Sequence, residues 1–196
     1  METFRLAEGL WRWTAVHPRW ELWPNHEREA PEVGCVYYEA DDATVLIDPL
    51  VPAGEEDDFF RHLDADVERR GLPVVILLTA EWHRRSADEL AARYDARIGG
   101  VLPKGVEEIP IEGADERQVA YFLRSHGALV VAEIFSVDID GELQANASPA
   151  LERPDELETS LERLMEQPVE RLLVSHGEPV LENAKARMAE ALARRQ

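Results

Sequence analysis

Four apolar stretches of the sequence are each followed directly by side chains that can do chemistry. The stretch at 44–47 runs into Asp48, the stretch at 129–132 into Glu133, and the stretch at 171–174 into Ser175 and His176. The fourth, at 74–78, leads into Thr79 and then a mixed cluster of Glu81, Trp82, His83, Arg84 and Arg85. Carboxylates and imidazoles can transfer protons or bind a divalent metal, and guanidinium groups can stabilise an oxyanion.

The residues around this mixed cluster predict how it is positioned. Pro73 precedes an apolar run rich in β-branched residues, which is typical of a strand buried on both faces. Ser86 is followed three residues later by Glu89, the spacing of a capping box, so a helix is expected from Ser86 to about Tyr94. Folds of the α/β class build their sites where such a strand enters the loop before a helix.

The rest of the chain predicts a mixed architecture. Alternation at Trp11 and Trp13 indicates a half-buried strand, and a helix over 55–70 ends at Gly71. We expect hairpins of 33–39 with 44–47 and of 117–124 with 128–135, a short extended piece at 106–112, a polar loop at 138–149, further strands at 97–102 and 171–174, and helices at 154–165 and 180–195. Residues 1–196 are expected to form a single domain.

Composition excludes several classes of partner. The chain carries 21 Lys and Arg against 40 Asp and Glu, a net charge of −19, so neither nucleic acid nor an anionic membrane is expected as a partner. No apolar run is long enough to span a bilayer, and the first residues lack the pattern of a signal peptide. Cys35 is the only cysteine and is expected to be a small strand residue, which fits a reducing cytoplasm. The sequence leaves open whether the chain forms a homo-oligomer.

The order and spacing of the four strand ends resemble the metallo-β-lactamase superfamily. The matching segments are Leu46-Ile47-Asp48-Pro49, Leu78-Thr79, Ala132-Glu133 and Ser175-His176-Gly177-Glu178-Pro179-Val180, and together they span nearly the whole chain. The resemblance implies an α/β (α+β) fold, a four-layer αββα sandwich of two mixed β-sheets flanked by helices. It also implies a metal site between the sheets at one edge.

The metal ligands of that superfamily are mostly replaced. Directly after Thr79, where the superfamily has a His-x-His-x-Asp-His loop, the ligand positions fall on residues that do not bind zinc: Ala80, Trp82, Arg84 and Arg85. The next histidine position is Ala114, so only Glu133, as the bridging acid, and His176 survive. We therefore expect no dinuclear zinc and no other cofactor. We also expect Arg85 to replace the metal charge through a bidentate pair with Glu133.

A second alignment keeps a metal site open. One inserted residue after Thr79 places Glu81 and His83 on the first two ligand positions, so that Glu81, His83, Glu133 and His176 could hold one zinc or another divalent ion. The alternative function is then a metal-dependent hydrolase of an ester or thioester.

The sequence favours a degenerate member whose remaining cleft binds a small molecule or a partner. Expected cleft residues are Asp48, Glu81, Trp82, Arg84 and Arg85, and the groups available for acid–base chemistry are His83, Glu133 and His176. Whether the chain is an enzyme is left open, and a purely structural role is a further alternative. Structural alternatives also stand for single residues: Asp48 as an orienter of backbone amides, Trp82 as core packing, and His83 as a histidine bonded to a backbone carbonyl. His17 and His26 could reach the cleft rim, and no role is expected for His62 or His126.

Overall fold

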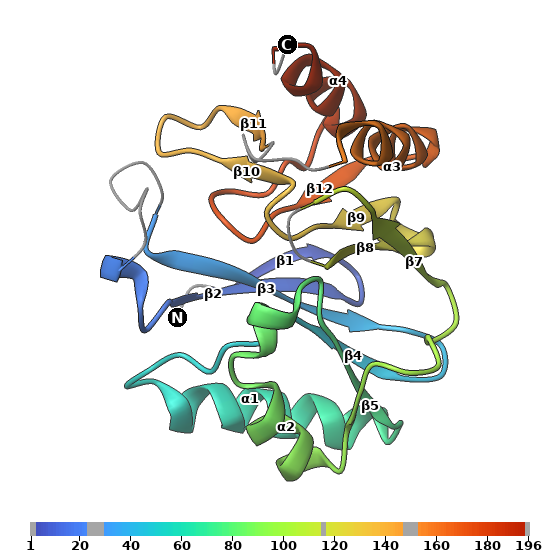
Figure 1. Cartoon of the computed structure of the whole chain (residues 1–196). Coiled ribbons are helices and arrows are strands. Elements are labelled where there is room, and N and C mark those ends of the chain that lie inside the picture. Colours follow the sequence, from blue (N-terminus) through green and yellow to red (C-terminus); the bar gives the residue numbers. More distant parts are fainter. Residues whose placement is uncertain (1–2, 23–29, 115–116, 147–152, 195–196) are drawn as a thin grey trace.

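The computed structural model describes residues 3–22, 30–114, 117–146 and 153–194. Two β-sheets lie face to face, with helices α1 and α2 against the outer face of one and α3 and α4 against the outer face of the other (Figure 1). This is the predicted four-layer αββα sandwich. The helices are α1 (Glu56–Arg70), α2 (Ala87–Tyr94), α3 (Pro154–Glu166) and α4 (Ala184–Arg194).

The first sheet has six strands in the order β1-β2-β3-β4-β5-β6. Neighbours from β1 to β4 pair antiparallel, and β4, β5 and β6 pair parallel. The carboxyl ends of β4 and β5 therefore meet at one edge of the sheet, as expected for a site built there. The strands are β1 (Thr3–Ala7), β2 (Leu10–Val16), β3 (Glu32–Glu39), β4 (Thr44–Ile47), β5 (Val74–Leu77) and β6 (Arg97–Ile98).

The second sheet has four strands in the order β12-β9-β8-β7, with β12 parallel to β9 and the other pairs antiparallel. A separate ribbon of β10 and β11 lies beside it. Short 3₁₀ turns complete the described elements: η1 (Trp20–Leu22), η2 (Glu81–Arg84) and η3 (Arg124–His126). The strands are β7 (Val106–Ile111), β8 (Gln118–Leu123), β9 (Ala128–Val130), β10 (Phe135–Val137), β11 (Leu143–Ala145) and β12 (Arg171–Leu173).

Three apolar clusters fill the spaces between the four layers, and strand alternation explains them. On β3, Val36 and Tyr38 point into the cluster between the sheets, whereas Cys35 and Tyr37 point toward α1 and α2. The third cluster joins the second sheet to α3 and α4. Removing apolar surface from water on all these faces stabilises the sandwich.

Several predicted boundaries are wrong. The strand expected at 97–102 ends at Ile98, because Gly99 and Gly100 adopt positive φ angles of 70° and 85°. The strand expected at 128–135 breaks after Val130 and resumes at Phe135 as β10, and the expected polar loop at 138–149 contains β11. The terminal helix begins at Ala184 rather than at 180.

The predicted capping box at Ser86 is also wrong. The Ser86 side chain makes no capping hydrogen bond to α2. Its Oγ instead accepts the N–H of Val51 at 3.0 Å, which ties the start of α2 to the loop after β4. In contrast, Gly71 ends α1 in the left-handed conformation, with φ 59°, as the sequence predicts.

Candidate functional site

Asp48 stands at the carboxyl end of β4 with a positive φ of 51°, and its carboxylate is buried. Oδ1 accepts the N–H of Thr79 at 2.8 Å, and Oδ2 accepts the hydroxyl of the same residue. Asp48 therefore fixes the backbone at the end of the neighbouring strand β5, which is the orienting role that the sequence suggests for it. Oδ2 also contacts Nδ1 of His83 at 3.0 Å.

His83 lies in turn η2, directly after β5, and only 2% of it is exposed. Its Nδ1 faces Asp48, and its Nε2 lies 3.1 Å from Oε1 of Glu133. The loop that carries it is also bound to the second sheet, because Thr79 accepts the N–H of Val119 at 2.8 Å. The expected partner of His83, a backbone carbonyl, is wrong: both ring nitrogens meet carboxylates.

Glu133 lies between β9 and β10, where the predicted strand breaks. The Asn146 side chain donates a hydrogen bond to the backbone carbonyl of Glu133 at 2.8 Å and so holds this segment in place. Oε1 of Glu133 lies 3.1 Å from Nε2 of His83 and 3.2 Å from Nε2 of His176. Two imidazoles from opposite sheets therefore meet at one carboxylate oxygen.

His176 follows β12 in a turn that is pressed between two strands. Its backbone pairs with Val33 of β3, and its carbonyl accepts the N–H of Val137 of β10 at 3.0 Å. The next residue, Gly177, has φ 83°, and a Cβ there would lie 2.0 Å from the carbonyl oxygen of Val137. Glycine is therefore required at 177 for the turn to bring His176 to Glu133.

The charges of this His83–Glu133–His176 cluster support one another. A neutral imidazole has one N–H, so only the doubly protonated ring of His83 can donate to both Asp48 and Glu133. Burial alone would lower the pKa of His83, but the charge of Asp48 and the hydrogen bonds to the two carboxylates outweigh it and raise the pKa above 6.5. For Glu133, burial would raise the pKa, but the hydrogen bonds from His176 and His83 hold it well below 4.5.

The predicted pair between Arg85 and Glu133 is wrong. The Arg85 guanidinium instead donates to the backbone carbonyl of Asp48 at 3.1 Å and to Oγ of Ser175 at 2.9 Å. It therefore joins the loop after β4 to the loop after β12. Arg85 contributes positive charge beside the cluster, but His83 and His176 form the direct contacts to Glu133.

The side chains of Glu81, Trp82 and Arg84, which are close to His83 in sequence, are exposed. Arg84 is exposed and pairs with Asp88 of α2, and Glu81 is exposed as well. Trp82 has 36% of its surface exposed and contacts the His83 ring edge-on at 5.8 Å, so its predicted place in the core is wrong. Of the expected cleft residues Glu81, Trp82, Arg84 and Arg85, only Arg85 lies with His83 in the buried site.

The described side chains do not fit the metal centre that the fold implies. Positions 80, 82, 84 and 85 offer no ligand, and Glu81 is exposed, whereas His83 and His176 are buried. Within the described ranges, no group of three or more His, Cys, Asp or Glu side chains is arranged to hold a metal ion.

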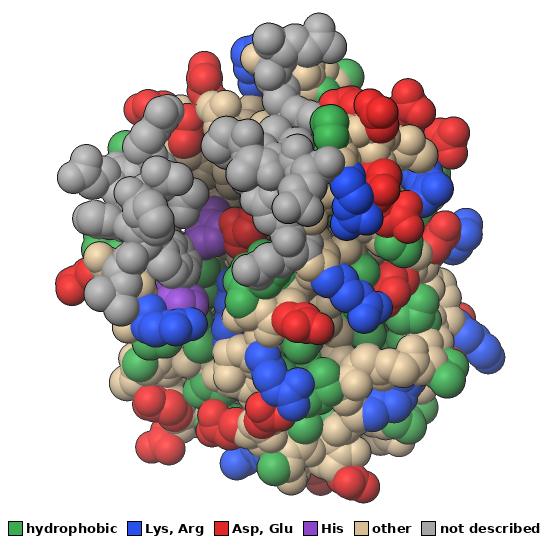
Figure 2. All heavy atoms as spheres, in the orientation of Figure 1, with side chains coloured by type: hydrophobic (Ala, Val, Ile, Leu, Met, Phe, Trp, Pro, Cys, Tyr) green, Lys and Arg blue, Asp and Glu red, His purple; other side chains and the backbone are tan. Residues whose placement is uncertain are grey.

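His17 lies close enough to this site for the charges there to change the pKa of its ring. Burial and the positive charges of Arg85 and Arg19 lower the pKa of His17 to about 4. The ring is therefore neutral at pH 7, and its Nδ1 accepts the N–H of Arg19 at 3.2 Å. Figure 2 shows histidine side chains beside acidic ones on the face in view. Among the remaining histidines, His62 is 65% exposed on α1, His126 lies in η3 and contacts Tyr38, and His26 lies outside the described residues.

Sequence reasoning missed Arg12 of β2, which is only 1% exposed. It stands between Trp11 and Trp13, and the Arg12 side chain donates to the carbonyl of Gly177, next to His176, at 2.6 Å. The alternation of side chains along a strand could have indicated this position. If Trp11 and Trp13 face one side of the strand, the arginine between them faces the other sheet.

Comparisons with known proteins agree with this architecture. No model of a known protein family matches the sequence, and no curated protein matches it. Solved structures do. An archaeal metallo-β-lactamase superfamily protein from Sulfolobus tokodaii is 18% identical over 95% of this chain and 85% of its own, with a TM-score of 0.65. A metallo-β-lactamase from Erythrobacter litoralis is 13% identical over 98% and 92%, with a TM-score of 0.63. A β-lactamase domain protein from Burkholderia ambifaria is 16% identical over 99% and 75%, with a TM-score of 0.58.

At such low identities the likeness concerns the fold rather than the activity. Three observations indicate the same fold: the order of layers, the four strand ends at one edge and the similarity to these structures. The chain has the metallo-β-lactamase fold.

Proposed function

We propose that this chain works without a metal and binds a small molecule through Glu133, with the His83–Glu133–His176 cluster in the place of the metal centre. The observation that carries the proposal is the single oxygen of Glu133 that lies within hydrogen-bond distance of two imidazoles, at 3.1 and 3.2 Å. An imidazolium beside a carboxylate supplies the charge balance that metal ions supply elsewhere. Removing either partner would leave an uncompensated charge in a buried site.

The cluster is better suited to binding than to proton transfer. An efficient general base has a pKa near the working pH, whereas the pKa of Glu133 is held well below its ordinary value of 4.5. The rings of His83 and His176 are buried, and their Nε2 atoms are engaged with Glu133. A carboxylate that stays ionised and fixed in place is a strong hydrogen-bond acceptor for a ligand.

The geometry of Glu133 indicates the chemistry of that ligand. Its side chain is 33% exposed, so it is the accessible member of the cluster. Oε1 is used by the two imidazoles, and Oε2 makes no hydrogen bond with another described residue. A ligand that donates a hydrogen bond, such as an amine or an alcohol, would complement Oε2.

Protein purified without a histidine tag is expected to contain no stoichiometric zinc, and added zinc is expected to leave its melting temperature unchanged. The reason is that a bound ion would have to displace the hydrogen bonds between Glu133 and both imidazoles. Elemental analysis and thermal melts measure this. One zinc per chain that is lost in both His83→Ala and His176→Ala would contradict the proposal and support the metal-dependent hydrolase of an ester or thioester.

Fragments that carry an amine or alcohol are expected to bind the wild-type chain and to bind Glu133→Gln about tenfold more weakly, because hydrogen bonds to a charged acceptor contribute about 1.5–3 kcal/mol. Ligand-observed NMR with amines, alcohols and uncharged isosteres measures this. Glu158→Gln, on the exposed face of α3, is the matched control. Equal binding by wild type and Glu133→Gln would show that Glu133 is not the contact.

A further inference from the structure

Arg12 is a buried charged side chain that forms no ion pair with another residue in the described part of the chain. Its Nη2 donates to the carbonyl of Gly177 at 2.6 Å, whereas Nε and Nη1 are buried and meet no hydrogen-bond acceptor among the described residues. Burial lowers the pKa of Arg12, and the nearby charge of Glu178 opposes that effect only in part. A buried cation without a compensating anion lowers the stability of the fold, unless a bound anionic group compensates its charge.

The backbone around Arg12 leaves room for the guanidinium. A Cβ at Gly34 of β3 would lie 2.8 Å from both Nε and Nη2 of Arg12, so only glycine leaves space for the group there. The N–H of Gly34 is bonded to the carbonyl of Ser175 at 2.7 Å, which fixes the strand against the turn that follows β12. The position of the guanidinium is therefore set by two backbone segments rather than by a carboxylate.

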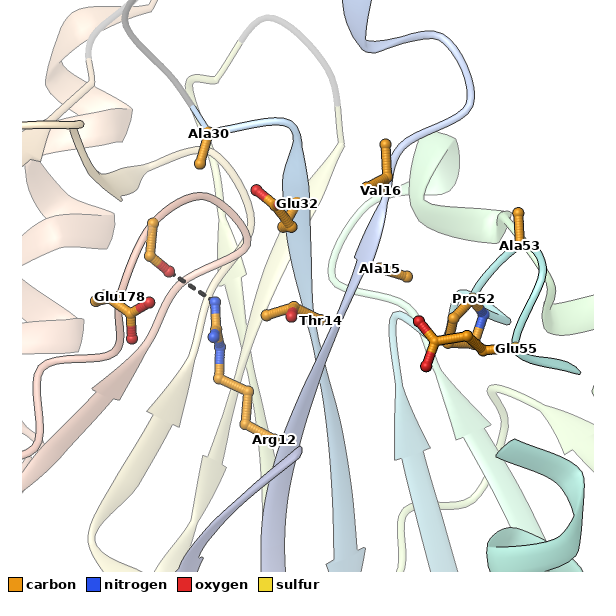
Figure 3. Close-up of a pocket in the computed structure, with 11 residues that line it drawn as sticks. Arg12, Thr14, Ala15, Val16, Ala30, Glu32, Pro52, Ala53, Glu55 and Glu178 are labelled. Atoms are coloured by element: carbon orange, nitrogen blue, oxygen red, sulfur yellow. Dashed lines mark hydrogen bonds between the residues drawn. The ribbon is translucent and has the colours of Figure 1, made fainter. Parts of the chain in front are cut away.

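Arg12 lies at the base of a pocket of about 440 Å³ between β2, β3, the loop after β4 and the Gly177 turn. This volume is within the range of small-molecule sites. Figure 3 shows the guanidinium between Thr14 and Glu178, with Glu32 beyond it toward the pocket rim. The buried end of the pocket is thus cationic, whereas the wall beside it carries the exposed carboxylate of Glu178 and the half-buried carboxylate of Glu32.

We propose that this pocket binds the head group of an α-amino acid, with the ligand carboxylate on Arg12 and the ligand ammonium on Glu178 and Glu32. An α-amino acid carries its two opposite charges on adjacent groups, as the pocket carries a guanidinium beside a carboxylate. A simple anion would satisfy Arg12 but would be repelled by Glu178. A simple cation would satisfy the carboxylates but leave the buried guanidinium unpaired. The proposal uses none of the cluster residues, so it does not depend on the function proposed for Glu133.

L-alanine, propionate and ethylamine are matched probes, because the second lacks the ammonium and the third lacks the carboxylate. We expect L-alanine to shift the amide NMR signals of Gly34 and Gly177 in a saturable way. Each of the other two probes is expected to bind about tenfold more weakly, as one charge-assisted contact is lost. Arg12→Met is expected to lose L-alanine binding. Glu178→Gln is expected to lose the preference for L-alanine over propionate.

Arg163→Met, which removes an arginine about half exposed on α3, is the matched control and is expected to bind L-alanine like the wild type. No saturable shift with L-alanine in the wild-type chain would overturn the proposal, as would unchanged binding in a folded Arg12→Met variant. Equal affinities of the wild-type chain for L-alanine, propionate and ethylamine would also overturn the proposal. If Arg12→Met fails to fold, the three-probe series on the wild type and on Glu178→Gln still decides the matter.

Discussion

His83→Ala is expected to lower the free energy of unfolding by about 3–5 kcal/mol, the usual cost of removing one partner from a buried ion pair. The substitution leaves Asp48, which is 3% exposed, without its cationic partner and removes one of the two imidazoles that hold Glu133. Urea unfolding at pH 6 measures the change. The matched control is Arg84→Ala, the next residue along the chain, which is exposed and is expected to change stability by about 0.5 kcal/mol or less.

Urea unfolding at several pH values tests whether the loss of charge causes the lower stability of His83→Ala. Because the pKa of His83 is raised in the folded chain, its contribution is complete below 6.5 and declines as the pH rises through the raised value. Because the pKa of Glu133 is lowered, its contribution is complete above 4.5 and declines as the pH falls toward the lowered value. The difference between wild type and His83→Ala is therefore expected to be largest between pH 4.5 and 6.5. A pH-independent difference would mean that lost packing, rather than lost charge, causes the change.

Gly177→Ala is expected to destabilise the chain by about 3 kcal/mol. The left-handed conformation costs a non-glycine residue about 1–2 kcal/mol, and the displacement forced by an overpacked site costs about 1–3 kcal/mol more. The new Cβ would lie 2.0 Å from the carbonyl oxygen of Val137, so the turn has to move. That movement would carry His176 away from Glu133.

Gly141→Ala separates these two effects. Gly141 has nearly the same φ, 82°, but a Cβ there meets no atom within 4 Å. It is therefore expected to cost only the conformational part, about 1–2 kcal/mol. Thermal melts and urea unfolding of both variants give the comparison. Equal losses for the two variants would mean that the contact with Val137 does not constrain the turn.

Much of the fold could be predicted from local patterns. Strands β4 and β5 were indicated by continuous apolar runs, though their parallel pairing was not, and the end of α1 was indicated by Gly71. These features depend on periodicity and on backbone freedom, which are properties of the sequence itself. The capping box at Ser86 failed because a tertiary contact, the N–H of Val51, uses the same hydroxyl.

The site was harder to predict, because its contacts join residues far apart in the chain. The convergence of Asp48, His83, Glu133 and His176 could be anticipated from four strand ends at one edge. The sequence does not predict which residue of 82–85 points inward, because this depends on the course of a 3₁₀ turn. The turn directs His83 to Glu133 and Arg84 to solvent, and leaves Arg85 bonded to Asp48 and Ser175.

The outermost strands of the two sheets have consequences for self-association. Strand β1 carries a register shift between Arg5 and Ala7, β6 has two residues, and β7 contains Pro110, which has no N–H to donate. Strand β12 is three residues long, and Leu172 exchanges backbone hydrogen bonds with Val180. Edge strands that are irregular, short or covered oppose the addition of a strand from another molecule. The described edge strands therefore disfavour a dimer in which a strand of a second copy extends either sheet.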